Sequence, residues 1–102
     1  MPSSVILKEG ALYISNEMYG RFFAGLEAVI LLRRESDLLI LPVRHAAAGG
    51  YLLKIRNRTG DRVVNAPDFF RENGLGDAST HEFSVTWSND RAALVAAKAF
   101  GL

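Results

Sequence analysis

Apolar residues along this chain of 102 residues occur in short runs, and polar residues and glycines separate one run from the next. Runs of this length, bounded by residues that favour turns, are typical of β-strands. The strands that the pattern predicts lie at residues 5–7, 11–14, 29–33, 38–41, 51–56, 62–65 and 83–87. The chain is therefore predicted to be mostly β with short helices between some of the strands.

The first helix is expected over residues 16–24. Apolar residues recur there at the three- and four-residue spacing of one helical face. Ser15 or Asn16 can accept the free N–H groups of the first turn. Gly25 then ends the helix, because a residue without Cβ takes the left-handed closing conformation easily.

A second short helix is predicted to begin at Pro67, whose missing N–H costs nothing in a first turn, and to end at Gly74. The C-terminal residues 91–100 leave two alternatives open. They are rich in alanine and are followed by Gly101, which favours a helix. Comparison with the first half of the chain favours a segment that begins as a strand.

The predicted strands at residues 29–33 and 38–41 are apolar at successive positions rather than at alternate ones. Such strands must be covered on both faces. In so small a chain, an intertwined second copy is one economical source of the second cover, and the pattern therefore favours a homo-oligomer.

The order of elements repeats. Residues 1–45 and 51–102 each read as strand, turn, strand, short helix ending in Gly-Leu, strand, polar turn and apolar tail, and residues 46–50 form a small, uncharged linker. The aligned pairs include residues 12–15 with 62–65, 25–26 with 74–75, and 29–32 with 83–86. We expect two half-repeats that share one core in a single domain over residues 1–102.

The second half carries a more specific pattern, with Arg62 and two valines before Pro67, then Phe70-Arg71 and Gly74-Leu75. This pattern resembles the AbrB/MraZ-like swapped-hairpin (SpoVT-AbrB-type) domains, in which an apolar strand precedes a proline, a short helix and a closing glycine. The resemblance implies a β-barrel-like swapped hairpin and a DNA-binding transcriptional regulator or an antitoxin-like protein.

The first half matches the same pattern more faintly, at residues 10–15, Met18 and Gly25-Leu26. Ala11 stands where the family usually has its strand-opening arginine, and Ser15 stands where it has proline. If the family's basic residues contact DNA, the first half lacks one of them.

Basic residues gather on the predicted hairpin at residues 51–65. Alternation along a strand sends Lys54, Arg56 and Arg58 to one face, opposite Leu53 and Ile55. Arg62 returns beside them on the second strand. Arginine forks suit phosphates and guanine edges, so Lys54, Arg56, Arg58 and Arg62 are the predicted DNA-binding residues. The alternative interpretation is a solvated outer strand face whose charges discourage edge-to-edge pairing.

Other chemistry finds little support in the sequence. The chain has no cysteine, and its two histidines, His45 and His81, lack the spacing of a metal site. There is no nucleophile elbow, phosphate-binding loop or dinucleotide fingerprint. Trp87 is placed inward by the alternation around it. We expect no catalytic activity, no cofactor and no metal.

The N-terminal residues do not resemble a secretion signal, and the longest apolar run, residues 38–43, is far shorter than a membrane span. The predicted location is the cytoplasm. Two hypotheses about function remain. One is a DNA-binding regulator, and the other is a non-catalytic protein-interaction or assembly module with the same fold, which the net charge of only +1 favours. A small-molecule enzyme ranks last.

Overall fold

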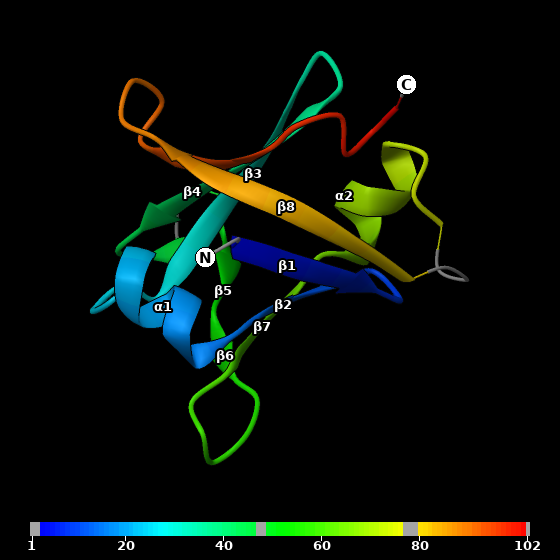
Figure 1. The fold of residues 1–102 in the computed structure, drawn as a ribbon. Coiled ribbons are helices and arrows are strands. Elements are labelled where there is room, and N and C mark those ends of the chain that lie inside the picture. Colours follow the sequence, from blue (N-terminus) through cyan, green and yellow to red (C-terminus); the bar gives the residue numbers. More distant parts are fainter. Residues whose placement is uncertain (1–2, 47–48, 77–79, 102) are drawn as a thin grey trace.

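A computed structural model describes residues 3–46, 49–76 and 80–101, and the predicted mostly β fold is confirmed. Two short helices accompany an antiparallel sheet with the strand order β5-β3-β4-β9-β8-β1-β2-β7-β6 (Figure 1). The elements are β1 (Ser3–Lys8), β2 (Ala11–Ile14), α1 (Asn16–Phe22), β3 (Ala28–Arg34), β4 (Asp37–Val43), β5 (Tyr51–Leu52), β6 (Lys54–Ile55), β7 (Arg62–Asn65), α2 (Pro67–Glu72), β8 (Thr80–Ser88) and β9 (Ala93–Ala96).

The sheet curls into a nearly closed barrel. Its two end strands, β5 and β6, are neighbours in the chain and are separated only by Leu53. The Leu53 side chain is 8% exposed, and its backbone N–H donates to the carbonyl of Glu27 at 2.8 Å. The continuous strand predicted at residues 51–56 is therefore wrong. The chain leaves the edge of β3 at Leu53 and joins the edge of β7, so one predicted strand becomes two.

The interior of the barrel is filled by aliphatic and aromatic side chains from every part of the described chain. The largest of them are Phe23, Phe70, Leu7, Leu12, Ile14, Leu38, Ile40 and Leu94, each below 2% exposed. In β4, Leu39 lies between Leu38 and Ile40 and is also buried, at 4% exposed. A single chain thus covers both faces of this part of β4, while Leu32 on β3 stays 46% exposed.

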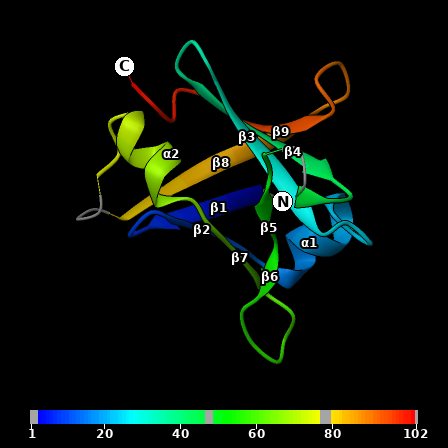
Figure 2. The ribbon, with the colours of Figure 1, turned by 180° about the vertical axis from the view of Figure 1, so that it is seen from behind.

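The two helices lie on opposite sides of the barrel (Figure 1, Figure 2). Ser15 caps α1 by accepting a hydrogen bond from the backbone N–H of Met18 at 3.2 Å, as one of the two predicted caps. The helix ends at Phe22, two residues before the predicted end, and Gly25 follows with a φ of +79°. In α2, Pro67 occupies the first turn as predicted.

The C-terminal segment is a strand, not a helix. β9 pairs with β4 on one side and with β8 on the other (Figure 2). Ala93 and Ala96 are fully buried between these neighbours. The pairing satisfies backbone groups along both adjacent strands, and this tertiary gain exceeds the helix propensity of alanine.

The order β1-β2-α1-β3-β4 is followed in the chain by β5 and then by β6-β7-α2-β8-β9. The pairs β1–β2, β3–β4, β6–β7 and β8–β9 are antiparallel hairpins. Of the predicted linker, Ala47 and Ala48 lie outside the described residues. No described helix is long and apolar enough to cross a membrane.

Candidate nucleic-acid interface

The hairpin formed by β6 and β7 projects from the barrel, at the bottom of Figure 1. Hydrogen bonds within its loop define its shape. The backbone N–H of Arg56 donates to the carbonyl of Asp61 at 2.7 Å, and the N–H of Gly60 donates to the carbonyl of Asn57 at 3.2 Å. Gly60 has a φ of +88°, a conformation that glycine adopts without strain. The basic loop is thus a folded turn.

Asp61 holds this loop against the start of α1. Its Oδ1 accepts the backbone N–H of Asn16 at 2.8 Å, and its Oδ2 accepts the amide of Asn57 at 3.0 Å and the hydroxyl of Thr59 at 3.3 Å. These bonds favour the ionised carboxylate. They lower the pKa of Asp61 below its ordinary value of 3.8, with the Asn57 amide as the largest cause and the charge of Arg56 as the smallest.

The structure brings the four predicted DNA-binding residues together on this hairpin. Lys54, Arg56 and Arg58 are exposed, and Arg62 is half-buried. The predicted facing of the strand is only partly right. Ile55, expected to face inward with Leu53, is 70% exposed. The chain changes partner strands at Leu53, so the simple alternation of a continuous strand does not carry through to Ile55.

Two of the arginines lie over tyrosine rings. The guanidinium carbon of Arg56 is 4.8 Å from the centre of the Tyr13 ring, and that of Arg62 is 3.8 Å from the centre of the Tyr19 ring. Arg62 also donates to the carbonyl of Gly60. Such cation–π contacts orient a guanidinium without neutralising its charge.

None of the four cations forms a salt bridge with a carboxylate among the described residues. The ion pairs His45 with Glu27 and Arg71 with Asp68 lie outside the hairpin. Lys54 and Arg58 form no side-chain hydrogen bond with any described residue either. Their positive charges therefore remain available to an external anion.

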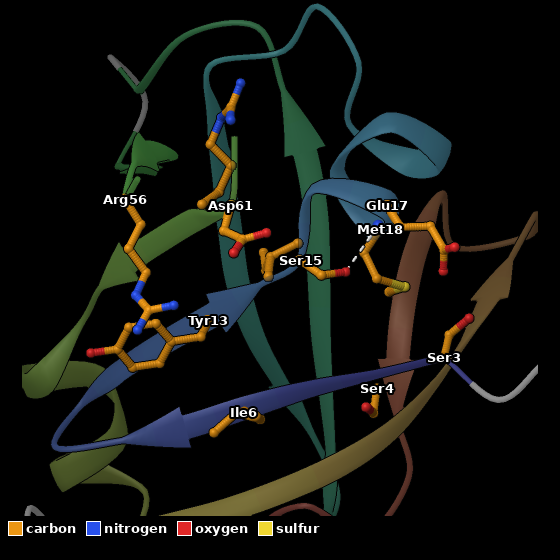
Figure 3. Close-up of a pocket in the computed structure, with 11 residues that line it drawn as sticks. Ser3, Ser4, Ile6, Tyr13, Ser15, Glu17, Met18, Arg56 and Asp61 are labelled. Atoms are coloured by element: carbon orange, nitrogen blue, oxygen red, sulfur yellow. Dashed lines mark hydrogen bonds between the residues drawn. The ribbon is translucent and has the colours of Figure 1, made fainter. Parts of the chain in front are cut away.

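A hollow of about 380 Å³ lies between this hairpin, β1, β2 and the start of α1. Figure 3 shows Arg56 over the Tyr13 ring on one side of it and Glu17 on the other. Ser3, Ser4 and Asp61 are also at its walls. Because it contains both cationic and anionic groups, this hollow is less suited to a polyanion than the outer surface of the hairpin.

Sequence reasoning missed the residues that support the cations: Tyr13, Tyr19, Asn16 and Asp61. These belong to β2, α1 and the loop, and they meet only because β2 pairs with β7. No local pattern along the chain indicates that pairing. The one available signal was Asp61 itself, an acidic residue in an otherwise basic turn.

Trp87 is a second residue whose observed position differs from the prediction. The alternation of the strand places it inward, but it lies one residue from the end of β8 and is 37% exposed. Its ring stacks on Phe22, and its Nε1 donates to Asn89 Oδ1 at 2.9 Å.

The remaining polar groups show no arrangement that would hold a metal. His45 is exposed beside Glu27, and His81 stacks on Phe83. No group of three or more histidine, aspartate or glutamate side chains in the described ranges is close enough together to bind an ion.

Comparison of the chain with protein-family models, with curated proteins and with solved structures finds no match. The likeness to AbrB/MraZ-like domains therefore stays a prediction from the sequence, beside an observed fold that is a nearly closed β-barrel.

Proposed function

We propose that this protein is a small cytoplasmic DNA-binding regulator that contacts the phosphate backbone with the β6–β7 hairpin. The observation that carries the proposal is a projecting turn whose four cations form no salt bridge with a carboxylate among the described residues. Unpaired Lys and Arg side chains bind phosphates and release counterions. The AbrB/MraZ-like pattern that begins at Arg62 supports the same function.

The contacts beneath the hairpin also support this proposal. Tyr13 and Tyr19 orient Arg56 and Arg62, and Asp61 fastens the loop to α1. Ordering of long side chains before binding reduces the entropy lost on association. A net charge of +1 gives one chain only modest affinity, so we propose that it acts as a homo-oligomer in which several hairpins engage one DNA molecule.

A protein-interaction or assembly module is the second candidate. The observation that favours it is two exposed aliphatic side chains beside the cations, Leu52 at 51% and Ile55 at 70%. Exposed apolar groups beside charged ones are common where proteins meet other proteins.

Binding of random duplex DNA at low salt separates these two functions. Fluorescence anisotropy of a labelled duplex is measured with the wild type and with a triple variant, Arg56→Ala, Arg58→Ala and Arg62→Ala. The matched control removes three exposed arginines elsewhere, Arg34→Ala, Arg44→Ala and Arg91→Ala. Both triple variants lose the same charge, so only their positions differ.

We expect the hairpin variant to lose at least about tenfold in affinity and the control variant to lose much less. Equal losses would show that net charge alone drives binding and would contradict the proposed interface. Absence of any wild-type binding at micromolar protein would favour the assembly module.

A further inference from the structure

A second surface, distinct from the basic hairpin, pairs the partly exposed Trp87 and the half-buried Phe22 with a cation. Trp87 stacks on Phe22 with ring centres 5.7 Å apart and ring planes inclined by only 14°. The guanidinium carbon of Arg21 lies 4.9 Å from the centre of the Phe22 ring. The hydrogen bond from Trp87 Nε1 to Asn89 fixes the indole further. A partly exposed tryptophan is thus held rigidly at the surface.

The stacked rings of Trp87 and Phe22 border a hollow of about 430 Å³ between α1 and β8, called the aromatic hollow below. The remaining lining residues are Ser3, Ser84, Val85 and Thr86. Among the described residues no carboxylate lines the hollow, and Arg21 gives it a positive charge. Hydroxyl groups, an aromatic face and a guanidinium suit a nucleobase with its attached phosphate.

Ser3 connects this hollow to the hairpin. It lines both this hollow and the one between β1, β2 and the hairpin, where Arg56 and Arg62 lie. The Nη1 of Arg21 donates to the Ser3 hydroxyl at 3.2 Å, which places the cation of the aromatic hollow at the junction. The two hollows therefore meet at Ser3 and Arg21, and the aromatic hollow, unlike the one beside the hairpin, has no carboxylate among its described lining residues.

We propose that the aromatic hollow binds single-stranded DNA, with an unpaired base stacked at Trp87, its phosphate at Arg21, and the neighbouring backbone reaching the cations on the outer surface of the hairpin. This inference rests on the proposed function and refines it. A base within a duplex is already stacked on its neighbours, so only an unpaired base can use an aromatic platform. The Arg21 cation and the absence of a carboxylate from the described lining of this hollow favour a nucleotide over an apolar protein segment.

Trp87 is the only tryptophan of the chain, so intrinsic fluorescence reports on this position alone. The full chain is titrated with an oligo(dT) strand while tryptophan emission is followed. Affinities for labelled oligo(dT) and for a labelled duplex are then measured for the wild type, Trp87→Ala, Trp87→Phe and the control Leu32→Ala. Leu32 is also a partly exposed apolar residue, but it lies on β3, away from this hollow.

We expect saturable quenching of the wild type. Trp87→Ala should lose about 5- to 150-fold in affinity for oligo(dT), the range that corresponds to stacking of one base. Trp87→Phe should recover part of the loss, because phenylalanine keeps an aromatic face and the β8 packing. The affinity of the Trp87 variants for the duplex should change little. Leu32→Ala should bind oligo(dT) and the duplex about as well as the wild type.

Other outcomes separate the two proposals. The stacking site is overturned if oligo(dT) does not quench the tryptophan emission, or if the wild type, Trp87→Phe and Trp87→Ala all bind oligo(dT) with equal affinity. Either result would overturn it even when the hairpin variant still loses duplex binding. If oligo(dT) quenches the tryptophan emission but the hairpin variant binds DNA as well as the wild type, the proposed hairpin interface is wrong and the stacking site is kept.

Discussion

At the scale of single residues, Asp61 joins the basic loop to the body of the protein. Its carboxylate accepts bonds from Asn57 and Thr59 within the loop and from the backbone of Asn16 at the start of α1. These bonds are stronger to the charged form than to the neutral one, which is why the pKa of Asp61 is lowered. The orientation of Arg56 and Arg62 therefore depends on a residue of opposite charge.

Replacement of Asp61 by asparagine should lower stability in a pH-dependent way. The pKa of Asp61 is lower in the folded state than its ordinary value of 3.8. Its contribution is thus fully present above about pH 4 to 5 and is lost as the pH falls through the folded pKa. Urea unfolding midpoints of the wild type and of Asp61→Asn should differ at pH 7 and converge in acid.

Asp90→Asn is the matched control, because Asp90 is exposed and makes no hydrogen bond with a described side chain. Its unfolding midpoint should follow that of the wild type across the pH range. A difference between wild type and Asp61→Asn that stays constant into strong acid would contradict the assigned role of the Asp61 charge.

The sequence predicts much at this scale. Ser15 was identified as a cap, and Lys54, Arg56, Arg58 and Arg62 as the basic cluster, because both depend on local spacing. The facing of Ile55 and Trp87 was predicted wrongly. Strand alternation assumes a continuous, fully paired strand, whereas the chain changes partners at Leu53 and β8 ends one residue after Trp87.

At the scale of elements, glycines determine how the hairpins and helices meet. Gly10, in the turn between β1 and β2, has a φ of +76°, and a Cβ there would lie 2.7 Å from the Cα of Pro67. The turn therefore packs directly against the first residue of α2. Gly20 is different: it lies inside α1, and a Cβ there would meet no atom within 4 Å.

Alanine at these two positions should have opposite effects. Gly20→Ala should stabilise the protein by about 0.5 to 1 kcal/mol, because alanine loses less backbone entropy in a helix. Gly10→Ala should destabilise it by more than about 1 kcal/mol, because both the left-handed backbone and the contact with Pro67 oppose a Cβ. Chemical denaturation measures both changes, and a stabilising Gly10→Ala would show that the turn does not pack on α2 as described.

The elements themselves were largely predictable, since strands and capped helices have local signatures. One exception is the strand predicted at residues 51–56, which is two strands, and another is residues 93–96, where alanine propensity favours a helix and the structure has β9. That outcome depends on pairing with β4, which is far away in the sequence, as well as with the adjacent β8, so only the comparison between the two halves of the chain pointed to it.

At the scale of the whole molecule, closure of the barrel determines where the cations lie. Leu53 lies where the two ends of the strand order meet, and the hairpin follows it immediately. Within the sheet, β2 pairs with β7, and Tyr13 of β2 and Tyr19 of α1 lie against Arg56 and Arg62 of the hairpin. The expectation of two half-repeats stays a prediction from the sequence, because few residues align between residues 1–45 and 51–102.

The dependence of duplex affinity on salt concentration tests the central claim most directly. If Lys54, Arg56, Arg58 and Arg62 each neutralise one phosphate, a plot of log K against log salt has a slope of about −3.6 per chain. Removal of the three arginines should reduce that slope to about −0.9. A slope that is the same for the wild type and the hairpin variant would show that these residues do not contact DNA.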